Sequence, residues 1–151
     1  MRNSPSCRAP ILVADDDAHD ALLLEITAEK VNLEIPLRTV SDGSAAIDYI
    51  LGRNAFTDRQ ANPFPSILLL DLKMPKMSGF DVLQFIRAQP GVRQLPIIIF
   101  SSSDDPGDIR RAYEAGANSY LCKPVSNDGL TELLTALRSY WYQFNHFPPC
   151  R

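Results

Sequence analysis

Four apolar runs of the sequence each end in residues that could take part in chemistry. ILVA is followed by Asp15 and Asp16, ILLL by Asp71, IIIF by Ser101, and SYLC by Lys123. Short aliphatic runs of this kind are typical of buried strands in a parallel sheet, whose carboxyl ends share one edge. We therefore expect three carboxylates, a hydroxyl and an ammonium group to meet at that edge. Three carboxylates at such close range require a cation, which predicts a bound divalent metal.

Helix capping is the alternative role for the acidic cluster, because Asp also favours the first turn of a helix. Asp17 is expected to be the capping residue. Of Asp15 and Asp16, one is expected to contact the metal directly and the other through water. The tight loop KMPKMSG further along the chain can also turn the backbone carbonyl of Lys73 toward the cation.

The remaining polar groups suit the transfer of a phosphoryl group. A carboxylate beside Mg²⁺ can attack an activated phosphoryl group and form an aspartyl-phosphate, which is the role expected of Asp71. Ser101 can donate to one phosphoryl oxygen and Lys123 can neutralise another. The alternatives are a turn-capping serine and a solvated surface lysine. A cis bond between Lys123 and Pro124 would aim the ammonium into the cleft, but the sequence leaves the isomer open.

Apolar runs alternate with helical patterns along the chain, which indicates five βα units in one open sheet. The first helix is expected to bury Leu22, Leu23 and Ile26. The polar connector 52–65 is long, and it is either an ordered flap or a mobile insertion. The expected strands are residues 11–14, 36–40, 66–70, 97–100 and 119–122, and the expected helices are about 18–31, 43–51, 79–89, 104–115 and 127 onward.

Composition narrows the class of protein. The chain has 151 residues, 45% of them hydrophobic, which suits one domain with a packed core. A net charge of -3 and a pI near 5.3 argue against nucleic-acid binding. The sequence has no run long enough to span a membrane and no apolar leader, so a cytoplasmic protein is expected. The three scattered cysteines are expected to be reduced thiols without a metal role.

The motifs ILVADDD, LLLDLKMPKMSGFDVL, PIIIFSSSD and GANSYLCKP together resemble the receiver domain of bacterial two-component response regulators. The resemblance covers residues 10–138, between a flexible tail of residues 1–9 and a C-terminal extension of residues 139–151. It implies a flavodoxin-like (βα)5 fold with strand order 2-1-3-4-5. It also implies a sensor histidine kinase as phosphoryl donor and a signalling protein rather than an enzyme.

The same resemblance assigns roles to particular residues. Asp71 is the expected phospho-acceptor, and Ser101 and Lys123 are its phosphoryl-binding partners. Tyr120 is the expected aromatic switch, although an ordinary half-buried strand tyrosine is the alternative. Lys73 and Ser103 occupy positions whose side chains tune dephosphorylation in this family. The expected ligands of Mg²⁺, with Mn²⁺ or Ca²⁺ as substitutes, are Asp15, Asp16, Asp71 and the Lys73 carbonyl.

The C-terminal extension is too short to form an effector domain, so output through protein contacts is expected. Trp141 and Phe144 are expected to continue the apolar stripe of the last helix, and this end either folds back or packs on a second subunit. The long connector and the Trp-containing tail also resemble regulators paired with bacterial phytochrome kinases, which implies a homodimer through the last helix. Two rivals are an interaction module that works without phosphorylation and a haloacid dehalogenase-type phosphatase. The second is disfavoured because position 73 is Lys.

Overall fold

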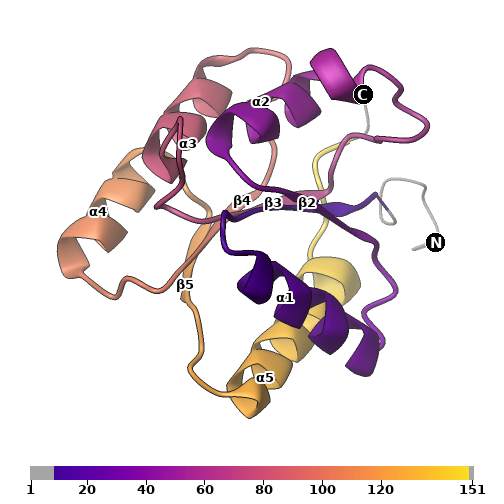
Figure 1. Ribbon diagram of the computed structural model, residues 1–151, viewed down its shortest axis with the longest axis vertical. Helices are drawn as coiled ribbons and strands as arrows, with labels where there is room; N and C mark the ends of the chain where they lie inside the picture. Colours follow the sequence, from indigo (N-terminus) through magenta and orange to yellow (C-terminus); the bar gives the residue numbers. More distant parts are fainter. Residues whose placement is uncertain (1–8, 150–151) are drawn as a thin grey trace.

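A computed structural model describes residues 9–149 of the chain. In that part, five parallel strands form one sheet in the order β2-β1-β3-β4-β5, which confirms the predicted fold (Figure 1). Most of the predicted tail of residues 1–9 lies outside the described residues, as do Cys7 and Cys150. The strands are β1 (Ile11–Ala14), β2 (Leu37–Val40), β3 (Ile67–Leu70), β4 (Ile97–Ser101) and β5 (Ser119–Cys122).

Helices cover both faces of the sheet (Figure 1). One face carries α1 (Ala18–Lys30) and α5 (Asn127–Leu137), and the other carries α2 (Gly43–Leu51), α3 (Gly79–Ala88) and α4 (Pro106–Glu114). Alternate residues of the central strands point into opposite cores, as the twofold period of a strand requires. In β3, for example, Leu68 and Leu70 join the α2–α3 core, whereas Ile67 and Leu69 join the α1–α5 core.

The predicted buried face of α1 was wrong for Leu22 and Ile26, whereas Leu23 is partly buried against the α1–α5 core. Leu22 and Ile26 are 52% and 53% exposed, and the buried residues are Leu24, Thr27 and Ala28. The segment LLLEI offers apolar side chains over more than half of the helix circumference, so spacing alone did not choose the inward face. The small side chains of Thr27 and Ala28 allow α1 to approach its neighbours closely.

The connector between α2 and β3 is an ordered flap, which was one of its two predicted states. It contains a short 3-10 helix, η2 (Asn54–Phe56). The Arg59 guanidinium donates to the carbonyls of Tyr49 and Ile50 at 2.6 and 2.7 Å. Both carbonyls lie in the last turn of α2, where carbonyls run out of helical amide donors, although the Tyr49 carbonyl also accepts from the Gly52 amide at 3.2 Å. The connector is therefore fastened to α2.

The chain beyond α5 departs from the predicted long helix. After Leu137 the backbone widens into a π-helix, η3 (Arg138–Phe144), in which the Asn145 amide donates to the Tyr140 carbonyl five residues back. The wider turn changes the direction of the side chains. Phe144 is consequently 71% exposed, which corrects the prediction that it continues the apolar stripe.

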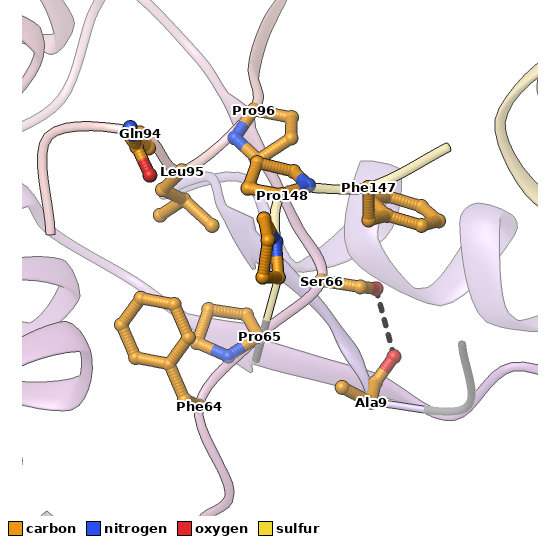
Figure 2. Close-up of a pocket in the computed structure, with 10 residues that line it drawn as sticks. Ala9, Phe64, Pro65, Ser66, Gln94, Leu95, Pro96, Phe147 and Pro148 are labelled. Atoms are coloured by element: carbon orange, nitrogen blue, oxygen red, sulfur yellow. Dashed lines mark hydrogen bonds between the residues drawn. The ribbon is translucent and has the colours of Figure 1, made fainter. Parts of the chain in front are cut away.

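The aromatic C-terminal segment folds back on its own domain, which was one of the two predicted alternatives. Trp141, Tyr142 and Phe147 pack against the α1–α5 core. Figure 2 shows Phe147 and Pro148 passing the amino-terminal edge of the sheet, beside a mostly apolar cavity of about 260 Å³. Ser66 at this edge donates to the Ala9 carbonyl at 2.8 Å. Between residues 9 and 149, no helix is both long and apolar enough to cross a membrane.

Candidate functional site

The sheet register places the polar strand ends together at one edge. Ala14 lies opposite Leu70 in the β1–β3 pair, so Asp15 and Asp71 leave neighbouring strands at the same level. The Asp71 amide also donates to the Ala14 carbonyl at 3.0 Å. Ser101 lies opposite Cys122 in the β4–β5 pair, which brings Lys123 to the same edge. Four of the predicted site residues, Asp15, Asp71, Ser101 and Lys123, therefore lie at one edge of the sheet.

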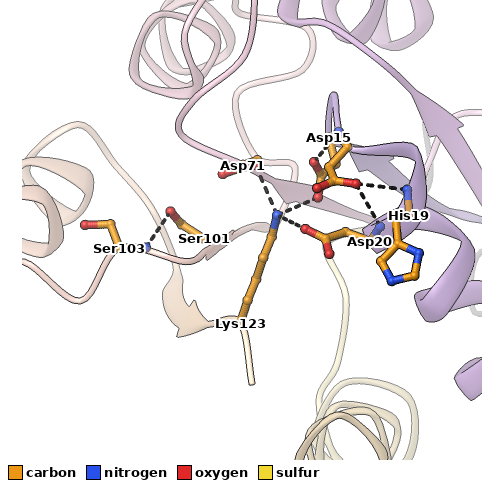
Figure 3. Close-up of polar contacts among 8 residues, drawn as sticks. Asp15, His19, Asp20, Asp71, Ser101, Ser103 and Lys123 are labelled. Carbon is orange, nitrogen blue, oxygen red and sulfur yellow. Dashed lines mark hydrogen bonds and ion pairs between the residues drawn. The ribbon is translucent and has the colours of Figure 1, made fainter. Parts of the chain in front are cut away.

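Lys123 lies at the centre of this cluster (Figure 3). Its Nζ is 2.7 Å from Asp15, 2.9 Å from Asp20 and 3.2 Å from Asp71. Its side chain is only 13% exposed, which rules out a solvated surface lysine. Burial favours the neutral amine, but the bonds to Asp15 and Asp20 outweigh burial and raise the pKa of Lys123. The peptide bond between Lys123 and Pro124, whose isomer the sequence left open, is trans, as are all peptide bonds among residues 9–149.

Asp15 is the most deeply buried acid of the cluster. Burial raises the pKa of its carboxyl, and the bonds from Lys123 and from the Asp17 amide offset only part of this effect. Asp17 itself caps α1, because its carboxylate accepts from the amides of His19 and Asp20. The predicted capping role of Asp17 is thereby confirmed.

Asp20 is a member of the site that sequence reasoning missed. It lies in the first turn of α1, and Figure 3 shows its carboxylate turned toward the Lys123 ammonium. The sequence offered one weak signal, an additional acid in the first turn of the helix that follows the Asp run. Acids are also favourable in the first turn of any helix, where they are often solvated, so only the fold distinguishes a site residue from a surface acid here.

The carboxylates of Asp15, Asp16 and Asp71 fit a divalent cation. One oxygen from each lies within 4.8 Å of the others. Asp15 and Asp71 are buried while Asp16 is exposed, so a metal would reach the group from the solvent side. Hard cations prefer such oxygen ligands, and Mg²⁺ commonly binds one or two carboxylates together with waters.

Ser101 and Tyr120 meet on the backbone of Ser103. The Ser101 hydroxyl oxygen accepts from the Ser103 amide at 3.2 Å, so Ser101 also caps the turn as its alternative role required. The Tyr120 hydroxyl donates to the Ser103 carbonyl at 2.8 Å, and burial raises the pKa of Tyr120.

Gly79 fixes the distance between α3 and the acidic edge. A Cβ at this position would lie 2.2 Å from the Asp71 carbonyl oxygen and 2.8 Å from the Leu72 Cα. The Gly79 amide donates to the Leu72 carbonyl at 2.9 Å, and Ser78 caps the helix. A glycine is required here because only its lack of a side chain lets the two backbones approach this closely.

A parallel sheet in this order, with an acidic triad, a hydroxyl and a lysine at its carboxyl edge, defines the receiver class of signalling proteins. The chain belongs to the response regulator receiver domain family, whose sequence profile matches residues 11–135. Receiver domains are components of two-component signalling systems.

Comparison with known structures places phytochrome-associated regulators among its relatives. A response regulator in red light signaling of R. palustris, RPA3017, is 36% identical with a TM-score of 0.88, and the match covers 93% of this chain and 99% of that one. The bacteriophytochrome response regulator RtBRR is 34% identical with a TM-score of 0.74, over 93% of this chain and 84% of that one. Response regulator Rcp1 of Synechocystis is 26% identical in its Mn²⁺-bound form, with a TM-score of 0.82 over 93% and 99% of the two chains.

Proposed function

We propose that Asp71 accepts a phosphoryl group from the phosphohistidine of a sensor histidine kinase and that the phosphorylated protein signals through protein contacts. The observation that carries this proposal is the placement of the Asp71 carboxylate. It lies with Asp15 and Asp16 in one cation-sized group and 3.2 Å from the Lys123 ammonium. A nucleophile, a cation site and a positive charge for the phosphoryl oxygens are thus assembled at one point.

The chemistry follows from these positions. An Asp71 carboxylate oxygen attacks phosphorus, the bond from phosphorus to the histidine nitrogen breaks, and that nitrogen regains a proton. Mg²⁺ held by Asp15, Asp16, Asp71 and the Lys73 carbonyl supplies neutralising charge to the phosphoryl oxygens when bound, and Mn²⁺ or Ca²⁺ are possible substitutes. Lys123 pairs with one phosphoryl oxygen. Slow attack of water on phosphorus then releases phosphate and restores Asp71.

Ser101 and Tyr120 are the residues whose conformations respond to phosphorylation of Asp71. Ser101 donates its hydroxyl proton to a second phosphoryl oxygen, and Tyr120 responds through the Ser103 backbone, which both residues contact. The alternative function is an interaction module that works without phosphorylation. Such a module would not require the acids, the hydroxyl and the lysine of this site. The complete set of acids, hydroxyl and lysine at one edge favours the phosphoryl acceptor.

The kinase is expected to dock on an exposed apolar surface beside the site. Leu22 and Ile26 lie one helical turn apart on α1, and Val125 after β5 is fully exposed. The Asp20–Lys123 ion pair holds the start of α1 beside the segment that contains Val125. Changing Leu22 and Ile26 to Ser should slow phosphotransfer from a phosphorylated kinase about tenfold, because two apolar contacts are lost. The measurement is the rate at which label moves from the kinase to this protein.

Two controls separate docking from chemistry. Labelling by acetyl phosphate needs no docked protein, so it should not change in the double variant. Tyr113→Ser alters a residue on α4 that is 49% exposed, and it should leave kinase transfer unchanged. Equal losses with both phosphodonors would contradict the docking surface.

A phytochrome-type kinase is the donor that the relatives favour. RPA3017 acts in red light signaling and RtBRR is a bacteriophytochrome response regulator, and both cover most of the chain. The expected cytoplasmic location belongs to the same proposal. In a panel of phosphorylated histidine kinases, a bacterial phytochrome should transfer label to this protein faster than kinases of other sensor types.

The homodimer is proposed to form through η3 and α5. Tyr140 and Phe144 are exposed on η3, beside an open groove lined by Leu121, Leu133 and Trp141. Because Trp141 already packs against its own core, Phe144→Ser is a cleaner test than Trp141→Ala. Light scattering should show a dimer for the wild-type protein and a monomer for Phe144→Ser. A monomeric wild-type protein at all concentrations would contradict the proposal.

A further inference from the structure

The start of α4 has an unusual cap. Asp105 is the N-cap residue, and its carboxylate accepts from the Asp108 amide at 3.1 Å. In a capping box, an acidic side chain at the position of Asp108 would return to the Asp105 amide. Here the Ser103 hydroxyl lies between them. It donates to the Asp108 carboxylate at 2.7 Å and accepts from the Asp105 amide at 3.3 Å.

The other polar groups of Ser103 reach into the phosphoryl site. Its amide donates to the Ser101 hydroxyl oxygen, and its carbonyl accepts from the Tyr120 hydroxyl. Ser103 therefore bonds to the site, to the switch tyrosine and to the first turn of α4 at once. A helix cap alone would not need this arrangement, because Asp105 and Asp108 could close the box without Ser103.

We propose that Ser103 is the positioning residue that couples the state of the Asp71 site to Tyr120 and to the first turn of α4. This inference rests on the proposed function, since it concerns how the phosphorylated state is transmitted. When Ser101 turns toward a phosphoryl oxygen, the Ser103 amide bonded to it is displaced. The Ser103 carbonyl and hydroxyl move with that amide, so the bonds to Tyr120 and Asp108 change together.

The side chain and the backbone of Ser103 have separable tasks. Ser103→Ala keeps the amide and the carbonyl but removes the hydroxyl that joins Asp105 to Asp108. The site should therefore still bind a phosphoryl group or its analogue, while this binding should no longer change the structure of the first turn of α4. Ser103→Thr retains the hydroxyl and should restore the response of α4. Ser102→Ala is the matched control, because Ser102 is the exposed neighbour of the same residue type.

The test uses the full chain with Mg²⁺ and beryllofluoride, an analogue of the phosphoryl group. Fluorine NMR follows both the bound beryllofluoride and a fluorotyrosine at position 120. The resonance of this fluorotyrosine is assigned as the one that is missing in Tyr120→Phe. Hydrogen exchange follows the amides of Asp108 and Ile109 in the first turn of α4. In the wild-type protein, loading should shift the Tyr120 resonance and change exchange at both amides.

In Ser103→Ala, the bound-fluoride signals should appear as in the wild-type protein. Exchange at the first turn of α4 should be about fivefold faster before loading, because the cap is incomplete. Loading should no longer change that exchange, while the Tyr120 shift should persist, because the Ser103 carbonyl that Tyr120 contacts is retained. Asp108→Ala breaks the same bond from the other side and should reproduce these effects.

The outcomes are distinguishable. If Ser103→Ala and Asp108→Ala bind beryllofluoride and exchange at the first turn of α4 still responds to loading as in the wild-type protein, the coupling role of Ser103 is overturned while the proposed function stands. If Ser103→Thr behaves like Ser103→Ala, the hydroxyl is not the coupling group and the proposal is likewise overturned. If the wild-type protein binds no beryllofluoride, the proposed function fails and this inference fails with it.

Discussion

Lys123→Met is expected to lower the free energy of unfolding of the metal-free protein by about 3 kcal/mol at neutral pH. In the described part of the chain, Lys123 is the only cation paired with Asp15, Asp20 and Asp71. Its removal leaves the buried carboxylates of Asp15 and Asp71 facing each other without a counter-charge. The measurement is urea denaturation in the presence of a chelator, compared between the variant and the wild-type protein.

The loss should depend on pH in a defined direction. Burial already raises the pKa of Asp15 above its ordinary value of 3.8, and loss of the lysine raises it further. A carboxyl whose pKa is higher in the folded state binds more protons there than in the unfolded chain. Stability is therefore lost as pH rises above about 4. The deficit of Lys123→Met should be small near pH 4 and full at pH 8.

Mg²⁺ should reverse much of this loss. Without Lys123, no ammonium competes with the metal for Asp15 and Asp71, so Mg²⁺ should bind the variant more tightly and stabilise it more than the wild-type protein. Lys30→Met, at an exposed position on α1, is the control for loss of a charge and should change stability by less than about 0.5 kcal/mol. A variant as stable as the wild-type protein in chelator at pH 8 would contradict the account of the cluster.

Gly79→Ala is expected to cost about 3 kcal/mol of stability and to impair phosphorylation together with folding. The new Cβ would lie 2.2 Å from the Asp71 carbonyl oxygen, and a backbone atom cannot rotate away as a side chain can. Either α3 must move outward or the Asp71 backbone must shift. Both changes disturb the alignment of the Asp71 carboxylate with its neighbours.

Gly107→Ala provides the matched control. Gly107 is also in the first turn of a helix, but a Cβ there would meet a side-chain atom, the Asp105 Oδ2 that caps α4, at 2.9 Å. That carboxylate can shift at the cost of part of its capping bond, and the preference of a helix for Ala over Gly, about 1 kcal/mol, offsets this cost. Urea denaturation should thus show a much smaller loss of stability for Gly107→Ala than for Gly79→Ala. A Gly79→Ala protein as stable as Gly107→Ala would show that the close approach is not required.

The sequence was sufficient to predict the strand ends, because the position of a residue at the carboxyl end of a buried parallel strand is set by topology. Asp71, Ser101 and Lys123 lie at the same edge of the sheet for that reason. Asp20 lies on a helix, where its direction depends on how α1 rotates against the sheet. That rotation was also what the prediction for Leu22 and Ile26 missed.

Two further features depend on contacts that a single sequence does not display. The π-helical turn after Leu137 follows from packing Trp141 and Tyr142 against the core rather than from helical spacing. The Ser103 hydrogen bonds depend on where the β4–α4 loop places its hydroxyl relative to Asp105 and Asp108. Both are tertiary effects, and local residue preferences carry no signal for them.

The central claim is that Asp71 is the phospho-acceptor, and intact-mass spectrometry tests it most directly. The protein is incubated with acetyl phosphate and Mg²⁺, and its mass is compared with that of Asp71→Asn treated in the same way. The account predicts that the wild-type protein gains the mass of one phosphoryl group, that a chelator prevents the gain, and that Asp71→Asn gains nothing. A wild-type protein that takes up no phosphoryl group, or an Asp71→Asn protein that takes up as much, would contradict it.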